Sequence, residues 1–155
     1  MNELVIRKTI EVDAPVSILW KVLTDNEFIK QYMFGCYAET DWTPGSPLLW
    51  MGSADGKLYV KGHVVSIKPP YRLVYTVIDP NSTIADIPSN YLTMTYDLKE
   101  RNDRASVLEV TQGDFAAVEN GENRYRDSLD EDNSVLTGIK KLAEAHFNRL
   151  VPLPQ

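Results

Sequence analysis

The order of the predicted elements constrains the fold of this chain of 155 residues more than any single motif does. One strand-like segment comes first, two short helical segments follow, and strand signals then run almost without a break to about residue 112. One long amphipathic helix closes the chain. An antiparallel sheet of this kind needs one face covered, and only the final helix is long enough to cover it. The order therefore predicts an α+β fold, in which a curved antiparallel sheet of about six to seven strands wraps around the C-terminal helix.

Alternating apolar and polar residues mark the first strand. Leu4, Ile6, Ile10 and Val12 fall on one face, with polar residues between them, which is the period of a half-buried strand. Lys8 is the exception, because it occupies an apolar position of this alternation.

Turn residues divide the middle of the chain into strands. The Asp55-Gly56 pair predicts a tight hairpin. Gly62 lies inside a strand-like run, which indicates a bulge or a close approach of another backbone segment. Residues 79–90 are rich in proline, asparagine and serine and are typical of a loop.

Capping patterns locate the helices. Asp13 and Pro15 predict the start of the first short helix. The Thr24–Glu27 segment is a capping box and predicts a second short helix from Thr24. A second capping box, Ser128–Glu131, predicts that the long helix runs from there to Leu150.

The charge excludes some classes of partner. The chain has 16 basic and 22 acidic residues and a net charge of −6. Binding to nucleic acid, or to an anionic membrane surface, needs a basic field, so both are disfavoured. No apolar run approaches the roughly 20 residues of a membrane span, and the N-terminus has no signal-peptide core. We expect a cytoplasmic protein of one domain, residues 1–155.

Rare residues argue against a metal site or a familiar catalytic site. Cys36 is the only cysteine, so the chain forms no internal disulfide and no thiolate cluster for zinc. His63 and His146 lie far apart in the sequence, outside any metal-binding spacing. Nucleotide-binding loops and serine-nucleophile elbows have no signature here. The sequence thus predicts no cofactor, no metal and no catalytic residue.

Several short segments, none specific alone, together resemble a known family. The segments are Ala14-Pro15-Val16, Thr40-Asp41-Trp42 with Pro44-Gly45, Gly62-His63-Val64, and Pro69-Pro70 followed by Arg72-Leu73-Val74-Tyr75-Thr76. The chain resembles the branch of the START-like (SRPBCC) superfamily that is similar to the activator of the heat-shock ATPase. The resemblance extends from about Val5 to Leu150 and implies the helix-grip fold.

The resemblance also implies an apolar cavity between the sheet and the long helix. Tyrosine and tryptophan suit such a wall, because their polar tips need partners when buried. The candidate lining residues are Tyr32, Trp42, Trp50, Tyr75, Met94, Tyr96, Asp132, Leu136, Ile139 and Ala143. The alternative is that all of them are ordinary core residues.

Most of the acidity is local. Residues 113–132 hold seven acids and two arginines, so they carry −5 of the net charge of −6. A solvated loop and a helix N-terminus explain these acids. If they line the mouth of the cavity, they favour a neutral or cationic ligand. Asp132 precedes Leu136 by one helical turn and is the acid placed to reach that mouth.

Three functions remain open. The first is non-enzymatic binding of a small apolar or aromatic molecule, as a carrier or sensor. The second, implied by the resemblance, is a co-chaperone-like module whose protein partner is a heat-shock ATPase. The third is a cavity enzyme of the cyclase type, for which Asp132, His63, Tyr75 and Tyr96 would supply acid and base.

Overall fold

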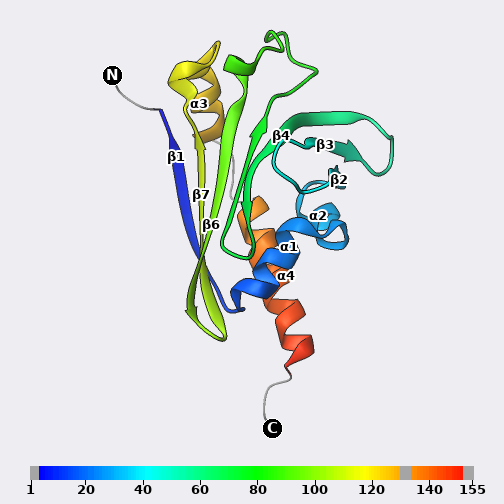
Figure 1. Ribbon diagram of the computed structural model, residues 1–155, viewed down its shortest axis with the longest axis vertical. Coiled ribbons are helices and arrows are strands. Elements are labelled where there is room, and N and C mark those ends of the chain that lie inside the picture. Colours follow the sequence, from blue (N-terminus) through cyan, green and yellow to red (C-terminus); the bar gives the residue numbers. More distant parts are fainter. Residues whose placement is uncertain (1–3, 130–133, 152–155) are drawn as a thin grey trace.

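The computed structural model describes residues 4–129 and 134–151. Its centre is one antiparallel sheet with the strand order β1-β7-β6-β5-β4-β3-β2 (Figure 1). The strands are β1 (Ile6–Val12), β2 (Cys36–Glu39), β3 (Pro47–Gly52), β4 (Leu58–Lys68), β5 (Arg72–Val77), β6 (Leu92–Asn102) and β7 (Ala105–Gly113). The first strand thus pairs with the last, and every other neighbour is consecutive in the sequence.

Four α-helices lie among the described residues. They are α1 (Val16–Thr24), α2 (Asn26–Tyr32), α3 (Gly121–Leu129) and α4 (Ser134–Leu150), and two short 3-10 turns are η1 (Pro88–Asn90) and η2 (Phe115–Ala117). Figure 1 shows α1 beside α4, with α3 near the opposite end of the sheet, next to β1 and β7. The predicted helix-grip fold, with its curved sheet, two short helices and long C-terminal helix, is confirmed.

Strand β1 follows the predicted alternation. Ile6 and Val12 are buried, whereas Arg7 and Thr9 are exposed. Lys8 lies on the same face as Ile6 and is half-buried. The chain therefore places one lysine on the inner face of the sheet, where the pattern calls for an apolar side chain.

Gly62 in β4 is required by a close backbone approach, one of the two predicted alternatives. A Cβ atom at this position would lie 1.6 Å from the Thr76 carbonyl oxygen in the neighbouring strand. No larger residue fits without moving one of the two strands.

The starts of α1 and α2 differ by one or two residues from the capping prediction. Pro15 is the N-cap residue of α1 and provides no side-chain cap, and the backbone N–H of Asp13 donates to the Glu144 carboxylate instead. Asp25 caps α2 by accepting from the Glu27 N–H at 2.9 Å. Thr24 is the last residue of α1, since Asp25 is extended with φ −99° and ψ 124°, and the Thr24 hydroxyl donates to the Trp20 carbonyl one turn earlier.

The prediction of one helix from Ser128 to Leu150 is wrong at its start. Ser128 is in α3, and α4 begins at Ser134; Asp130, Glu131 and Asp132 lie outside the described residues. Residues 113–127 show no clear apolar periodicity and are expected from the sequence to be irregular or weakly helical, but tertiary contacts stabilise α3 there. The Tyr125 ring meets the Phe115 ring edge-on at 5.6 Å, and a Cβ on Gly121 would lie 1.7 Å from the Phe115 carbonyl oxygen.

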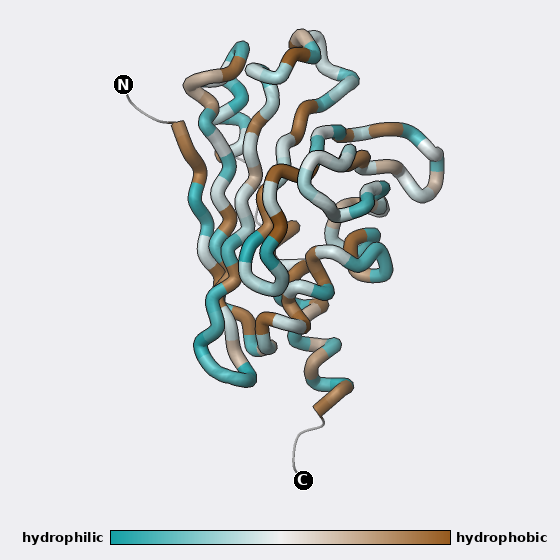
Figure 2. Tube along the Cα trace, in the orientation of Figure 1, coloured by the Kyte–Doolittle hydropathy of each residue, from teal (hydrophilic) through white to brown (hydrophobic). Residues whose placement is uncertain are grey.

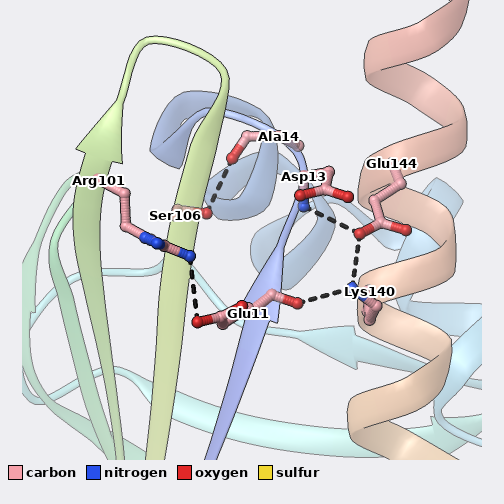
Figure 3. Close-up of polar contacts among 7 residues, drawn as sticks. All are labelled: Glu11, Asp13, Ala14, Arg101, Ser106, Lys140 and Glu144. Carbon is pink, nitrogen blue, oxygen red and sulfur yellow. Dashed lines mark hydrogen bonds and ion pairs between the residues drawn. The ribbon is translucent and has the colours of Figure 1, made fainter.

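Polar contacts fasten α4 to the end of β1 (Figure 3). The Lys140 ammonium donates to the Glu11 carbonyl at 2.7 Å and pairs with the Glu144 carboxylate at 2.7 Å. That carboxylate also accepts from the Asp13 N–H at 2.9 Å. One carboxylate and one ammonium thus satisfy two backbone groups at the corner between β1 and α1.

The main core lies between the sheet and helices α1, α2 and α4. Leu19, Leu108, Ile139 and Ala143 are completely buried in it. In Figure 2 the charged tip of the β6–β7 hairpin is hydrophilic, as its position away from this core requires.

Candidate functional site

A cavity of about 670 Å³ opens between the sheet and the first turn of α4. This volume is in the range of pockets that hold drug-sized molecules. Its central wall consists of Trp50, Tyr75, Met94 and Tyr96. Val135 and Leu136 of α4, with Ser128 of α3, border it from the helical side.

The central wall consists of neighbouring aromatic rings that are tilted against one another, and two of them carry a hydrogen-bonded pair of hydroxyls. The ring centroids of Trp50 and Tyr75 are 5.8 Å apart, and those of Tyr75 and Tyr96 are 5.7 Å apart. The Tyr75 and Tyr96 hydroxyls form a hydrogen bond of 2.9 Å. Burial raises the pKa of both phenols, so both are neutral at ordinary pH and offer polar tips on an otherwise apolar wall.

Strands β1 and β7 form one end of the cavity. Its lining there consists of Ile6, Lys8, Val110 and Gln112. The register places Lys8 directly opposite Val110, and Ile6 directly opposite Gln112. A cationic and an amide side chain thus share this end with two apolar ones.

The loop after α2 and the β3–β4 hairpin form the other end, which is the rim. Phe34 there has an exposed fraction of 80% and a positive φ of 54°, an unusual backbone conformation for a bulky residue. Asp55 is exposed, and hydrogen bonds from the Tyr59 hydroxyl and the Lys57 N–H lower its pKa. Burial, with the charge of Asp55, raises the pKa of the Cys36 thiol, so this thiol is not an activated nucleophile.

The structure brings five of the sequence candidates to the cavity: Trp50, Tyr75, Met94, Tyr96 and Leu136. Four others lie elsewhere: Tyr32, Trp42, Ile139 and Ala143 are not among the lining residues and pack in or against the main core. Tyr32 is buried, and its hydroxyl donates to the Leu23 carbonyl at 3.1 Å, so its polar tip is satisfied within the core. Asp132 lies outside the described residues.

Sequence reasoning did not select Lys8 and Gln112 as lining residues. The signal for Lys8 was present, since this lysine breaks the apolar alternation of β1. Gln112 continues the inner-face positions of Leu108 and Val110 in β7 and interrupts them in the same way. A polar residue at an apolar position of a strand is the pattern that would have found both.

The family follows from a match over most of the chain. A family model described as "Activator of Hsp90 ATPase homolog 1-like protein" matches residues 13–144. The chain belongs to this family.

Several solved structures have the same fold as this chain. ChR145 from Cytophaga hutchinsonii is 30% identical to it, with a TM-score of 0.70 and coverage of 94% of this chain and 98% of that one. An HSP90 activator from Plasmodium falciparum is 17% identical, with a TM-score of 0.65 and coverage of 89% and 94%. The Aha1 dimer from Colwellia psychrerythraea is 12% identical, with a TM-score of 0.66 and coverage of 90% and 96%. No curated protein sequence matches this family member.

Of the residues named for a cavity enzyme, Tyr75 and Tyr96 come together in this family member, His63 does not join them, and Asp132 lies outside the described residues. His63 is exposed, is not among the lining residues, and forms a hydrogen bond of 3.1 Å with the Thr76 hydroxyl. It therefore does not line the cavity together with Tyr75 and Tyr96. Within residues 4–129 and 134–151, no three His, Cys, Asp or Glu side chains gather as metal ligands. No helix of these residues is both long and apolar enough to cross a membrane.

Proposed function

We propose that this protein binds a small apolar or aromatic molecule in the cavity between the sheet and α4, without chemical conversion. The observation that carries the proposal is the cavity itself, about 670 Å³ in volume, with Trp50, Tyr75 and Tyr96 in its wall. A filled interior would have argued against binding, because ligand pockets of soluble proteins occupy about 300–1,000 Å³. Aromatic walls with a few polar tips suit a flat or ring-shaped ligand with one polar group.

The test uses two naphthyl probes, 2-(2-naphthyl)ethanol and 2-naphthylacetate, titrated into the protein by calorimetry. We expect a dissociation constant of about 100 μM or tighter for at least one of them, which is modest for a ligand of this size. The Val110→Trp variant places an indole in the cavity between β1 and β6, so it should weaken binding about tenfold or more.

Val107→Trp is the matched control, because Val107 lies on the opposite face of the same strand β7 and does not line the cavity. It should bind the probes as the wild type does. Binding that Val110→Trp leaves unchanged would place the probes elsewhere. A wild-type protein that binds neither probe would overturn the proposal.

A second candidate function is modulation of the heat-shock ATPase, and the family description favours it. The similar Plasmodium falciparum protein is described as an HSP90 activator, and this chain covers 94% of it. The rate of Hsp90 ATP hydrolysis with and without this protein tests the candidate. An unchanged rate at saturating concentrations would exclude it, and this outcome is independent of the probe titrations.

A further inference from the structure

The inner face of β1 holds a lysine that no described residue pairs with. Lys8 lines the cavity and is half-buried. Among the ion pairs and side-chain hydrogen bonds of the described residues, none involves its ammonium group. A half-buried charge without a partner is unfavourable, and an anionic ligand group beside it would offset that cost.

The register gathers further hydrogen-bond donors around Lys8. Lys8 and Tyr96 both lie opposite Val110, one from β1 and the other from β6. Because neighbouring strands are about 5 Å apart, their Cα atoms are about 10 Å apart across Val110. Both side chains are long enough to reach one small group held above Val110.

Gln112 and the tyrosine pair complete this arrangement. Gln112 lies two residues along β7 from Val110, diagonal to both Lys8 and Tyr96, and its amide carries two donor hydrogens. In the Tyr75–Tyr96 pair, one hydroxyl donates to the other, so the second hydroxyl keeps a hydrogen for which no described residue is the acceptor. Three kinds of donor therefore surround one point of the cavity wall.

The carboxylate among the described lining residues is Asp55, at the other end of the cavity. It is exposed on the rim, and its oxygens accept from the Tyr59 hydroxyl and the Lys57 N–H. Its charge is solvated and partnered, so it does not neutralise the end of the cavity at Lys8.

From this arrangement, and resting on the proposed function, we infer that the cavity takes an organic anion: a carboxylate beside Lys8 and Gln112, with an apolar or aromatic body against Trp50 and Tyr75. This reverses the preference for a neutral or cationic ligand. That preference depended on the acidic stretch that ends at Asp132, whose last residues lie outside those the structure describes.

The test compares three probes with one aromatic body: 2-naphthylacetate, 2-(2-naphthyl)ethanol and 2-(2-naphthyl)ethylammonium. At neutral pH the first is an anion, the second is neutral and the third is a cation. We expect the wild type to bind the anion about tenfold more tightly than the alcohol, since a hydrogen bond to a charged group contributes about that factor. The cation should bind most weakly.

Lys8→Met keeps the length of the side chain and removes its charge. It should abolish the preference for the anion: the affinity for 2-naphthylacetate should fall about tenfold, and the affinity for the alcohol should stay the same. Lys99→Met is the matched control, because Lys99 is an exposed lysine that is not among the lining residues, opposite Val107 in the sheet. It removes the same net charge and should keep the preference. Thermal unfolding of both variants verifies that each is folded.

The outcomes separate this inference from the proposed function. If anion and alcohol bind equally and Val110→Trp weakens both, the cavity binds ligands and the inference is wrong. A preference for the anion that survives Lys8→Met, or tightest binding of the cation, also overturns it. If none of the three probes binds, the proposed function fails first.

Discussion

The space between the sheet and α4 has two parts: a filled part, called the closed end below, and the part that holds the cavity, called the open end. The same strands line both. At the closed end, Leu108 of β7 and Ile139 and Ala143 of α4 are completely buried. At the open end, Met94, Val110 and Gln112 of β6 and β7 line a cavity instead. Helix α1 packs against α4, β6 and β7. The closed end therefore coincides with the part of the sheet that α1 covers.

The largest expected effect is a loss of stability, and it differs between two substitutions that lie one helical turn apart in α4. Ile139→Ala at the closed end should lower the free energy of unfolding by about 4 kcal/mol, because it removes a completely buried side chain and leaves a new cavity. Leu136→Ala at the open end should cost about 2 kcal/mol, since Leu136 already borders the existing cavity and its removal only enlarges it. Urea unfolding measures both.

Equal losses for the two variants would contradict the distinction between the ends. The same outcome would indicate that the space at Leu136 is closed by neighbouring side chains in solution.

The open end should also be the more sensitive to alkaline pH. Burial raises the pKa of Tyr32, Tyr75 and Tyr96 in the folded protein above the usual value near 10. The unfolded chain then loses these protons first, so stability is fully present below about pH 10 and falls as the pH rises further. Above about pH 10 each such tyrosine should therefore lower the free energy of unfolding as the pH rises.

Urea unfolding at a series of pH values measures this loss. The double variant Tyr75→Phe, Tyr96→Phe should show a smaller decline than the wild type, because only Tyr32 remains of the three. Parallel declines in the two proteins would show that ionisation of the pair at the open end does not contribute.

Local patterns predicted the elements better than they predicted the site. The alternation in β1 and the turn at Asp55-Gly56 are local, and the structure has both. Either Thr24 or Asp25 can cap a helix; in the structure Asp25 accepts from the Glu27 N–H and caps α2, whereas the Thr24 hydroxyl donates to the Trp20 carbonyl within α1. Helix α3 has no apolar stripe, and its contact with Phe115 cannot be inferred from the sequence of α3 itself.

The cavity depends on packing between distant elements, which a single sequence does not encode locally. Ile139 and Leu136 both belong to the apolar stripe of α4, yet only Leu136 reaches the cavity. The sequence shows Lys8 as an exception to the apolar alternation. Its place in the cavity depends on Val110 and Tyr96, which are far away in the sequence and adjacent in the sheet. Polar exceptions on apolar faces are therefore the residues to examine first.

The smallest expected effect concerns the polar contacts of the closed end. Lys140→Met should lower the free energy of unfolding by about 1 kcal/mol, because the Glu11 carbonyl and the Glu144 carboxylate both lose a donor at 2.7 Å. Lys141→Met, at the exposed neighbouring position, is the matched control and should change stability by less than about 0.5 kcal/mol.

The same variant sharpens the distinction between the two ends. High salt should reduce the difference between Lys140→Met and wild type only in part, because salt screens the ion pair with Glu144 and not the hydrogen bond to the Glu11 carbonyl. Affinity for the naphthyl probes should stay at the wild-type value, since Lys140 does not line the cavity. A loss of affinity in Lys140→Met would show instead that the position of α4 at the closed end sets the shape of the open one, and the two ends would then have to be treated as one coupled unit.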